Sequence, residues 1–237
     1  EYKQAVLALI ARVHDTHANI WGQDLALKQY KGTNFAPLEI TFIENKAVVT
    51  DYHDKELGAR TGIKVGDIIE KINGKAVDAL IQEKLPFTPA SNYPTQLRDI
   101  ARDLLRTSDS ILSVHYRHNG EVASKQIECF SLDKINIYRK FAKKDTCFKL
   151  INTDIAYLYP GSVKNAYFPS IMPEILKAKG LIIDFRCYPS DFIVFSLSEY
   201  LLPEPTPFVK FSTGSITSPG LFTINENLKA GSGNDDY

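Results

Sequence analysis

Apolar residues recur at helical spacing in two segments of the chain and predict one helix in each. In residues 3–14, Val6, Leu9 and Ile10 fall on one helical face. Residues 94–106 begin with a proline, which suits the first turn of a helix. Their apolar stripe contains Leu97, Ile100, Ala101, Leu104 and Leu105.

Between and after these helices, apolar and polar residues alternate with the period of half-buried strands. This alternation predicts strands over residues 38–43, 47–52, 68–72, 110–118 and 121–130. Asn73-Gly74 and Asn119-Gly120 mark hairpin turns, because both residue types tolerate positive φ. Residues 37–131 are therefore predicted to form one small β-rich domain.

The last part of the chain follows a different pattern, in which strands and helices take turns. Strands are predicted over 155–159, 181–186 and 207–212, and helices over 170–179 and 192–202. Residues 181–186 are almost continuously apolar, which favours a parallel sheet covered by helices on both faces. The predicted fold class is α+β and multidomain, with a helical segment (1–36), a β-rich domain (37–131) and an α/β part (132–237).

The composition of the chain argues against several classes of function. The 237 residues contain 28 Lys+Arg and 28 Asp+Glu, so no overall positive charge favours a nucleic-acid partner. No apolar run reaches the roughly 20 residues that a transmembrane helix needs. The cysteines lie far apart and the histidines have no completing ligands, so we predict neither a metal site nor a cofactor.

The segment ELGARTGIKVGDIIEKINGKAV resembles the PDZ modules of tail-specific (C-terminal processing) serine peptidases. Gly62 and Gly66 permit turn dihedrals that other residues avoid, and Asp67 can accept from neighbouring amides. The predicted structural turn residues are Gly62, Gly66, Asp67, Asn73 and Gly74.

A PDZ module binds an extended peptide at a strand edge and holds its terminal carboxylate in a loop of free amides. The resemblance places this loop at residues 34–38, although Pro37 has no amide to donate. The predicted peptide-binding residues are Phe35, Ala36, Leu38, Ile40, Leu97, Ile100, Ala101 and Leu104. The alternative is a PDZ fold that serves only as a scaffold or gate.

Residues 179–186 (KGLIIDFR) resemble the family strand that precedes the oxyanion hole, in an α/β core of the crotonase or Clp-protease kind. The family continues with two glycines, where this chain has Ser190 and Asp191. Their backbone amides are the predicted oxyanion candidates, since such a site needs N–H donors rather than particular side chains. The alternative role for Asp191 is N-cap of the following helix.

Asp15-Thr16-His17-Ala18 resembles an Asp-x-His-Ala segment that ends the N-terminal helical region of the family. A cap at the helix exit, or a solvated pair formed by His14 and His17, is the favoured role. A metal site would need further ligands.

The resemblance implies an endopeptidase whose PDZ-like module presents a peptide or protein substrate to a Ser/Lys pair. No residue of this chain matches that pair, and the polar tail AGSGNDDY follows an incomplete sheet, so we expect truncation and no catalytic residue in this chain. The family also implies an extracytoplasmic bacterial setting. The alternative is a non-catalytic peptide-binding or scaffold protein on a degenerate protease fold.

Overall fold

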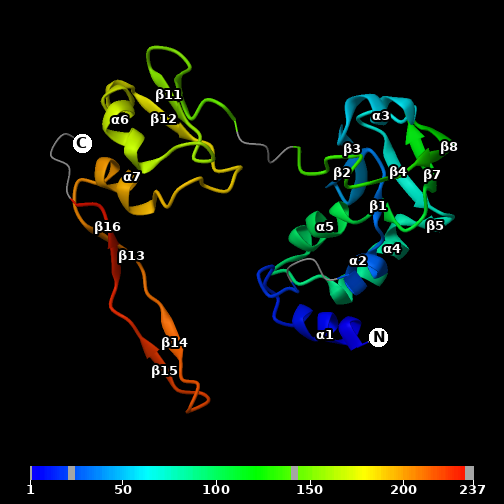
Figure 1. Cartoon of the computed structure of the whole chain (residues 1–237), viewed down its shortest axis with the longest axis horizontal. Coiled ribbons are helices and arrows are strands. Elements are labelled where there is room, and N and C mark those ends of the chain that lie inside the picture. Colours follow the sequence, from blue (N-terminus) through cyan, green and yellow to red (C-terminus); the bar gives the residue numbers. More distant parts are fainter. Residues whose placement is uncertain (1, 21–24, 140–143, 233–237) are drawn as a thin grey trace. The chain divides into compact units, whose positions relative to one another are not determined.

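The computed structural model describes residues 2–20, 25–139 and 144–232. The chain divides into two compact units, residues 1–140 and residues 141–237, and Figure 1 shows the elements of each. Helices and antiparallel strands occur in both units, so the predicted α+β, multidomain fold class is confirmed.

Unit 1 is built on an antiparallel sheet with the strand order β2-β3-β4-β7-β8, in which the short β5 also pairs with β4. The strands are β2 (Leu38–Ile43), β3 (Lys46–Tyr52), β4 (Ile68–Ile72), β5 (Lys75–Ala76), β7 (Ile111–His118) and β8 (Glu121–Glu128). Asn73, Gly74, Asn119 and Gly120 all have positive φ, as tight hairpin turns require.

The helices of unit 1 are α1 (Tyr2–Ala11), α2 (Leu25–Lys31), α3 (Lys55–Arg60), α4 (Val77–Lys84), η1 (Leu85–Phe87) and α5 (Tyr93–Arg102). The Asn92 side chain caps α5 by accepting from the amide of Thr95 at 2.9 Å. The prediction of a helix to residue 106 is wrong. After α5, the carboxylate of Asp103 accepts from Lys31 and Arg106, and the chain turns into β6 (Arg106–Thr107).

The core of unit 1 lies between its sheet and the helices α4 and α5. A small second sheet has the order β6-β1-β9, with β1 (Asn34–Phe35) between β6 and β9 (Phe130–Ser131). Cys129 is buried beside it, and burial, followed by the nearby Asp109 carboxylate, raises the pKa of its thiol to about 12.

Unit 2 contains a three-stranded sheet and two helices. β10 (Phe148–Leu150) is antiparallel to β11 (Ile155–Leu158), which is parallel to β12 (Gly180–Ile183). The parallel pair is joined through η3 (Asn165–Tyr167) and α6 (Phe168–Lys177), and α7 (Val194–Leu201) follows β12. The core of unit 2 contains Ala156, Leu158, Val163, Phe168, Met172, Ile175, Ile193 and Leu197.

Two expectations for this sheet are wrong. β12 ends at Ile183 instead of residue 186. Helices do not cover both of its faces: Leu181 and Ile183 pack against the core of unit 2, whereas Ile182 remains 47% exposed. The apolar run in the sequence therefore reflects an uncovered outer side rather than a doubly covered strand.

The predicted third parallel strand is also wrong, because β13 (Thr206–Val209) does not join this sheet. β13 pairs antiparallel with β16 (Leu228–Ala230), and β14 (Ser212–Gly214) pairs with β15 (Phe222–Ile224). These strands form the narrow orange and red ribbon of Figure 1. The expectation of truncation drawn from the tail falls partly on residues 233–237, which lie outside the described residues.

Candidate functional site

The residues predicted to line a peptide groove in unit 1 are core residues. β2 is an end strand of the sheet and packs against α5, as the groove requires. However, the side chains meant to line the groove are all less than a tenth exposed, and Leu104 lies beyond the end of α5. They are Phe35, Ala36, Leu38, Ile40, Leu97, Ile100, Ala101 and Leu104.

The predicted carboxylate loop at residues 34–38 is largely occupied by the protein itself. Phe35 lies in β1, which pairs with β6 on one side and β9 on the other. The amide of Ala36 donates to the carbonyl of Leu105 at 3.1 Å. The expectation of a loop of free amides is therefore wrong at these positions, and β2 offers a ligand mainly the backbone of its outer edge.

Three of the turn residues of the PDZ-like segment, Gly62, Gly66 and Asp67, form a compact corner before β4, whereas Asn73 and Gly74 form the turn from β4 to β5. Gly62 and Gly66 have φ values of +72° and +97°, which favour glycine. The buried carboxylate of Asp67 accepts from the amide of Lys64 at 2.8 Å and contacts the ring of His118 at 2.6 Å. Asp67 thus links this corner to His118, the last residue of β7.

Asp15 and His17 lie just beyond α1 and contact each other. Oδ1 of Asp15 accepts from the amide of His17 at 2.7 Å and lies 3.0 Å from its ring Nδ1. These contacts, the backbone one first, lower the pKa of the Asp15 carboxyl. The geometry is that of a local turn closed by an aspartate.

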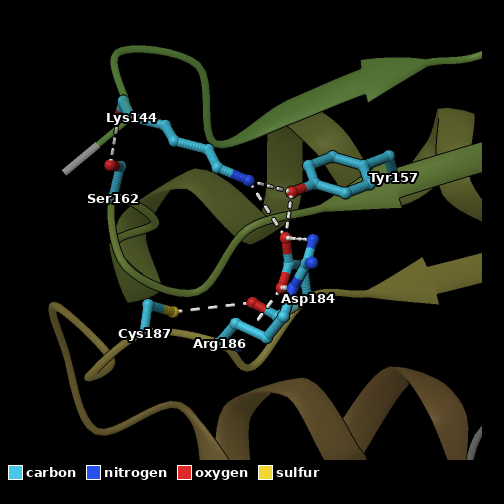
Figure 2. A network of polar contacts seen from close by, with 6 residues as sticks. All are labelled: Lys144, Tyr157, Ser162, Asp184, Arg186 and Cys187. Carbon is cyan, nitrogen blue, oxygen red and sulfur yellow. Dashed lines mark hydrogen bonds and ion pairs between the residues drawn. The ribbon is translucent and has the colours of Figure 1, made fainter. Parts of the chain in front are cut away.

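A denser polar network surrounds Asp184 in unit 2 (Figure 2). Asp184 follows β12, and its side chain is only 4% exposed. It accepts from Lys144 Nζ at 3.0 Å and from the Tyr157 hydroxyl at 2.6 Å. Arg186 donates to it through Nε at 2.8 Å, Nη2 at 2.9 Å and its own amide at 3.1 Å.

These contacts fix the charges of the network. Hydrogen bonds from Arg186, then from Tyr157 and Lys144, hold the pKa of the Asp184 carboxyl far below its usual range. The bond to Tyr157, then that to Asp184, raises the pKa of the Lys144 amine. Asp184 is consequently an anion and Lys144 and Arg186 are cations at neutral pH.

The sequence did not predict this network. Lys144 and Tyr157 belong to segments that carry no motif, and side chains distant in sequence cannot be paired from spacing alone. One signal was present, since a carboxylate inside the apolar run 181–185 requires partners wherever that run is buried.

The two oxyanion candidates lie in the loop before α7, and both form hydrogen bonds with neighbouring backbone groups. The amide of Ser190 donates to the carbonyl of Pro160 at 2.9 Å, so it already has an acceptor. The carboxylate of Asp191 accepts from the amides of Asn165, at 3.2 Å, and Phe192, at 3.0 Å. Asp191 therefore stabilises the start of η3; its expected role as N-cap of α7 is wrong, because Ile193 occupies that position.

Other kinds of site were sought within the described residues. In those ranges, no three His, Cys, Asp or Glu side chains gather in a way that could hold a metal ion. None of the helices described is both long and apolar enough to cross a membrane.

Comparison with known proteins shows that this chain is similar to a solved structure in its fold. No family model matches the chain, and no curated protein does. The crystal structure of mature CPAF is similar over 91% of this chain and 51% of that protein, with 13% sequence identity and a TM-score of 0.55. This likeness shows the fold, and the chain spans about half of that protein's length.

Two further solved structures match with TM-scores too low to argue a common fold. A photosystem II D1 C-terminal processing protease is 15% identical over 87% of this chain and 52% of its own, with a TM-score of 0.31. A PDZ domain protein from Parabacteroides distasonis is 11% identical over 81% of this chain and 48% of its own, with a TM-score of 0.30. The chain is thus similar in fold to mature CPAF, and its weaker matches include protease and PDZ proteins.

Proposed function

We propose that this chain is the front part of a serine endopeptidase of the tail-specific kind. Residues 37–131 form a PDZ-like module that presents a peptide or protein substrate, and residues 132–237 begin the α/β protease core. The catalytic Ser/Lys pair belongs to residues that are not part of this chain. An extracytoplasmic bacterial location belongs to the same proposal.

The observation that carries the proposal is the presence of both family-like segments in one chain, each in a matching structural setting. The GIKVGD corner joins two strands of an antiparallel sheet in unit 1. The two isoleucines of the IIDFR segment end β12, the second strand of a parallel pair in unit 2, and Asp184 follows directly. The fold likeness to mature CPAF covers 91% of this chain and about half of that protein.

Substrate presentation would use the backbone of β2. Ile43 pairs with Lys46 across the two-residue turn Glu44-Asn45, so Ile43 and Thr41 bond to β3. The backbone groups of Ile40 and Phe42 then point to the outer edge, where no described strand pairs with them. An extended peptide could add there as a further strand.

The test is the natural gene product. We expect a chain longer than 237 residues that reacts with a fluorophosphonate probe at one serine, while the present chain remains unlabelled. Replacement of that serine by alanine would abolish labelling and peptide cleavage. A natural product that ends near Tyr237, or a longer one without a reactive serine, would contradict the proposal.

The second candidate is a non-catalytic peptide-binding or scaffold protein. It is favoured by the Ser190 amide, which already donates to Pro160, and by the occupied loop at residues 34–38. Peptide binding by a natural product that the phosphonate does not label would establish this alternative.

A further inference from the structure

The sheet of unit 2 has one face that its helices leave uncovered. The register places Lys149 of β10 opposite Tyr157 of β11, and Tyr157 opposite Ile182 of β12. Leu181 and Ile183 point to the helices, so this row lies on the other face. Asp184, two residues after Ile182, reaches the Tyr157 hydroxyl on the same side.

Positive charge gathers on this face. Lys144 and Lys149 place their Nζ atoms 5.2 Å and 5.5 Å from the ring centre of Tyr157, and Arg186 is bound to Asp184. We call Lys144, Lys149 and Arg186 the basic face. Lys144 and Arg186 both bind the one buried carboxylate, that of Asp184, and Lys149 lies over Tyr157, so the three cations outnumber the carboxylate and leave a positive charge open to solvent.

Arg186 is both fixed and accessible. Nε and Nη2 hold the two oxygens of Asp184, yet the side chain is 87% exposed. A guanidinium is planar, so this clamp also fixes the direction of Nη1, for which no hydrogen bond is found among the described residues. A donor that is already oriented loses little freedom when an anion binds.

We propose that the basic face binds the C-terminal carboxylate of a peptide, with Arg186 and Lys144 as its main partners. The inference rests on the proposed function, because it names the part of the substrate that the same protein recognises. In unit 1, the loop predicted for this role has occupied amides. In unit 2, charge-assisted hydrogen bonds from Arg186 and Lys144 would hold the carboxylate in place of those amides.

The surroundings suit the terminal residue of such a peptide. Ile182 is 47% exposed on this face, and Phe185, between Asp184 and Arg186, is 55% exposed. Apolar side chains beside fixed cations favour a terminal residue that is itself apolar. A leucine terminus is accordingly a suitable probe.

The experiment uses fluorescence polarisation with the whole chain and a fluorescein-labelled octapeptide that ends in leucine. The same peptide with an amidated terminus is the matched ligand. We expect the amide to bind about tenfold more weakly or worse, because it removes a charged partner of Arg186. Equal binding of acid and amide, or no binding of either, would overturn the inference.

Variants locate the site. Arg186→Gln and Lys144→Gln should each weaken the free acid about tenfold, and Arg186→Lys should weaken it less because it keeps the charge. Lys177→Gln is the control, since Lys177 ends α6 and pairs with Glu174. Thermal unfolding of each variant shows whether unit 2 is folded. If the control weakens binding as much as Arg186→Gln, the inference fails.

The two proposals fail separately. A longer natural product with a reactive serine, but with binding indifferent to amidation, would remove this inference and leave the peptidase proposal intact. Carboxylate-dependent binding without a reactive serine would keep the basic face and remove the peptidase.

Discussion

The two units differ in the side chains that they expose to solvent. In unit 1, Val49 and Val114 are fully buried and the strands that carry them turn mostly polar residues outward, while single apolar side chains such as Ile43 and Ile111 are half exposed. In unit 2, Ala156 and Leu158 are equally buried, but Ile182 of the sheet and Phe222 and Ile224 of the ribbon remain exposed.

The difference is largest at the ribbon, where β15 exposes both of its apolar side chains, Phe222 at 64% and Ile224 at 69%. Exposed apolar surface of this extent is typical of regions that contact another structure. An isolated two-stranded ribbon is also marginally stable in water. Unit 1 thus has the features of an independent module, whereas the sheet and ribbon of unit 2 have those of an interface.

The strongest test of the comparison removes a core side chain from unit 2 alone. Phe168 is 1% exposed, and Phe168→Ala should cost about 3–5 kcal/mol of folding free energy through lost burial and a cavity. Hydrogen exchange should accelerate throughout unit 2 and stay unchanged in unit 1. Tyr188→Ala, at a side chain 94% exposed, is the control. Equal acceleration in both units would show that they fold together.

A smaller loss should follow from overpacking unit 1 at Gly58. A Cβ there would lie 2.3 Å from Cγ of Tyr52, so Gly58→Ala should destabilise by about 1–3 kcal/mol although alanine favours helices. Urea unfolding measures the change, with Lys55→Ala of the same helix as control. The double variant with Tyr52→Ala should be less unstable than the sum of both changes; additivity would show that the two sites do not touch.

The polar network of unit 2 should make its stability depend on pH. The pKa of Asp184 is lower in the folded state than the ordinary value of about 4, so its contribution is present at neutral pH and is lost as the pH falls below that value. The difference in unfolding temperature between wild type and Asp184→Asn should be large at about pH 7 and smaller at about pH 3. Asp154→Asn, at an exposed ion pair, should show no such convergence.

The smallest effect is expected on the uncovered face. Ile182→Lys should change the unfolding free energy by no more than about 0.5 kcal/mol and reduce association at high concentration. Denaturant unfolding and light scattering measure the two effects. Ile183→Lys, on the packed side of the same strand, should instead be strongly destabilising. A large loss in Ile182→Lys would mean that this face is covered.

Local patterns predicted the elements better than their partners. The strands of unit 1 and the Asn-Gly turns follow from alternation and from residues that tolerate positive φ. The end of α5 depends on Lys31, which reaches Asp103 from a distant part of the chain. The pairing of β13 with β16 and the approach of Lys144 to Asp184 are equally non-local. No window of sequence contains both partners of these contacts.

The reactivity of the buried thiol of unit 1 can be used to measure how fast this unit opens. Cys129 is 7% exposed and its pKa of about 12 leaves almost no thiolate at neutral pH, whereas Cys147 and Cys187 are partly exposed. Alkylation should therefore modify Cys147 and Cys187 in the native protein and reach Cys129 only when β8 transiently separates from its neighbours. At reagent concentrations high enough for alkylation to outpace reclosing, the rate at which Cys129 is trapped would report the lifetime of the closed module in the unmodified chain.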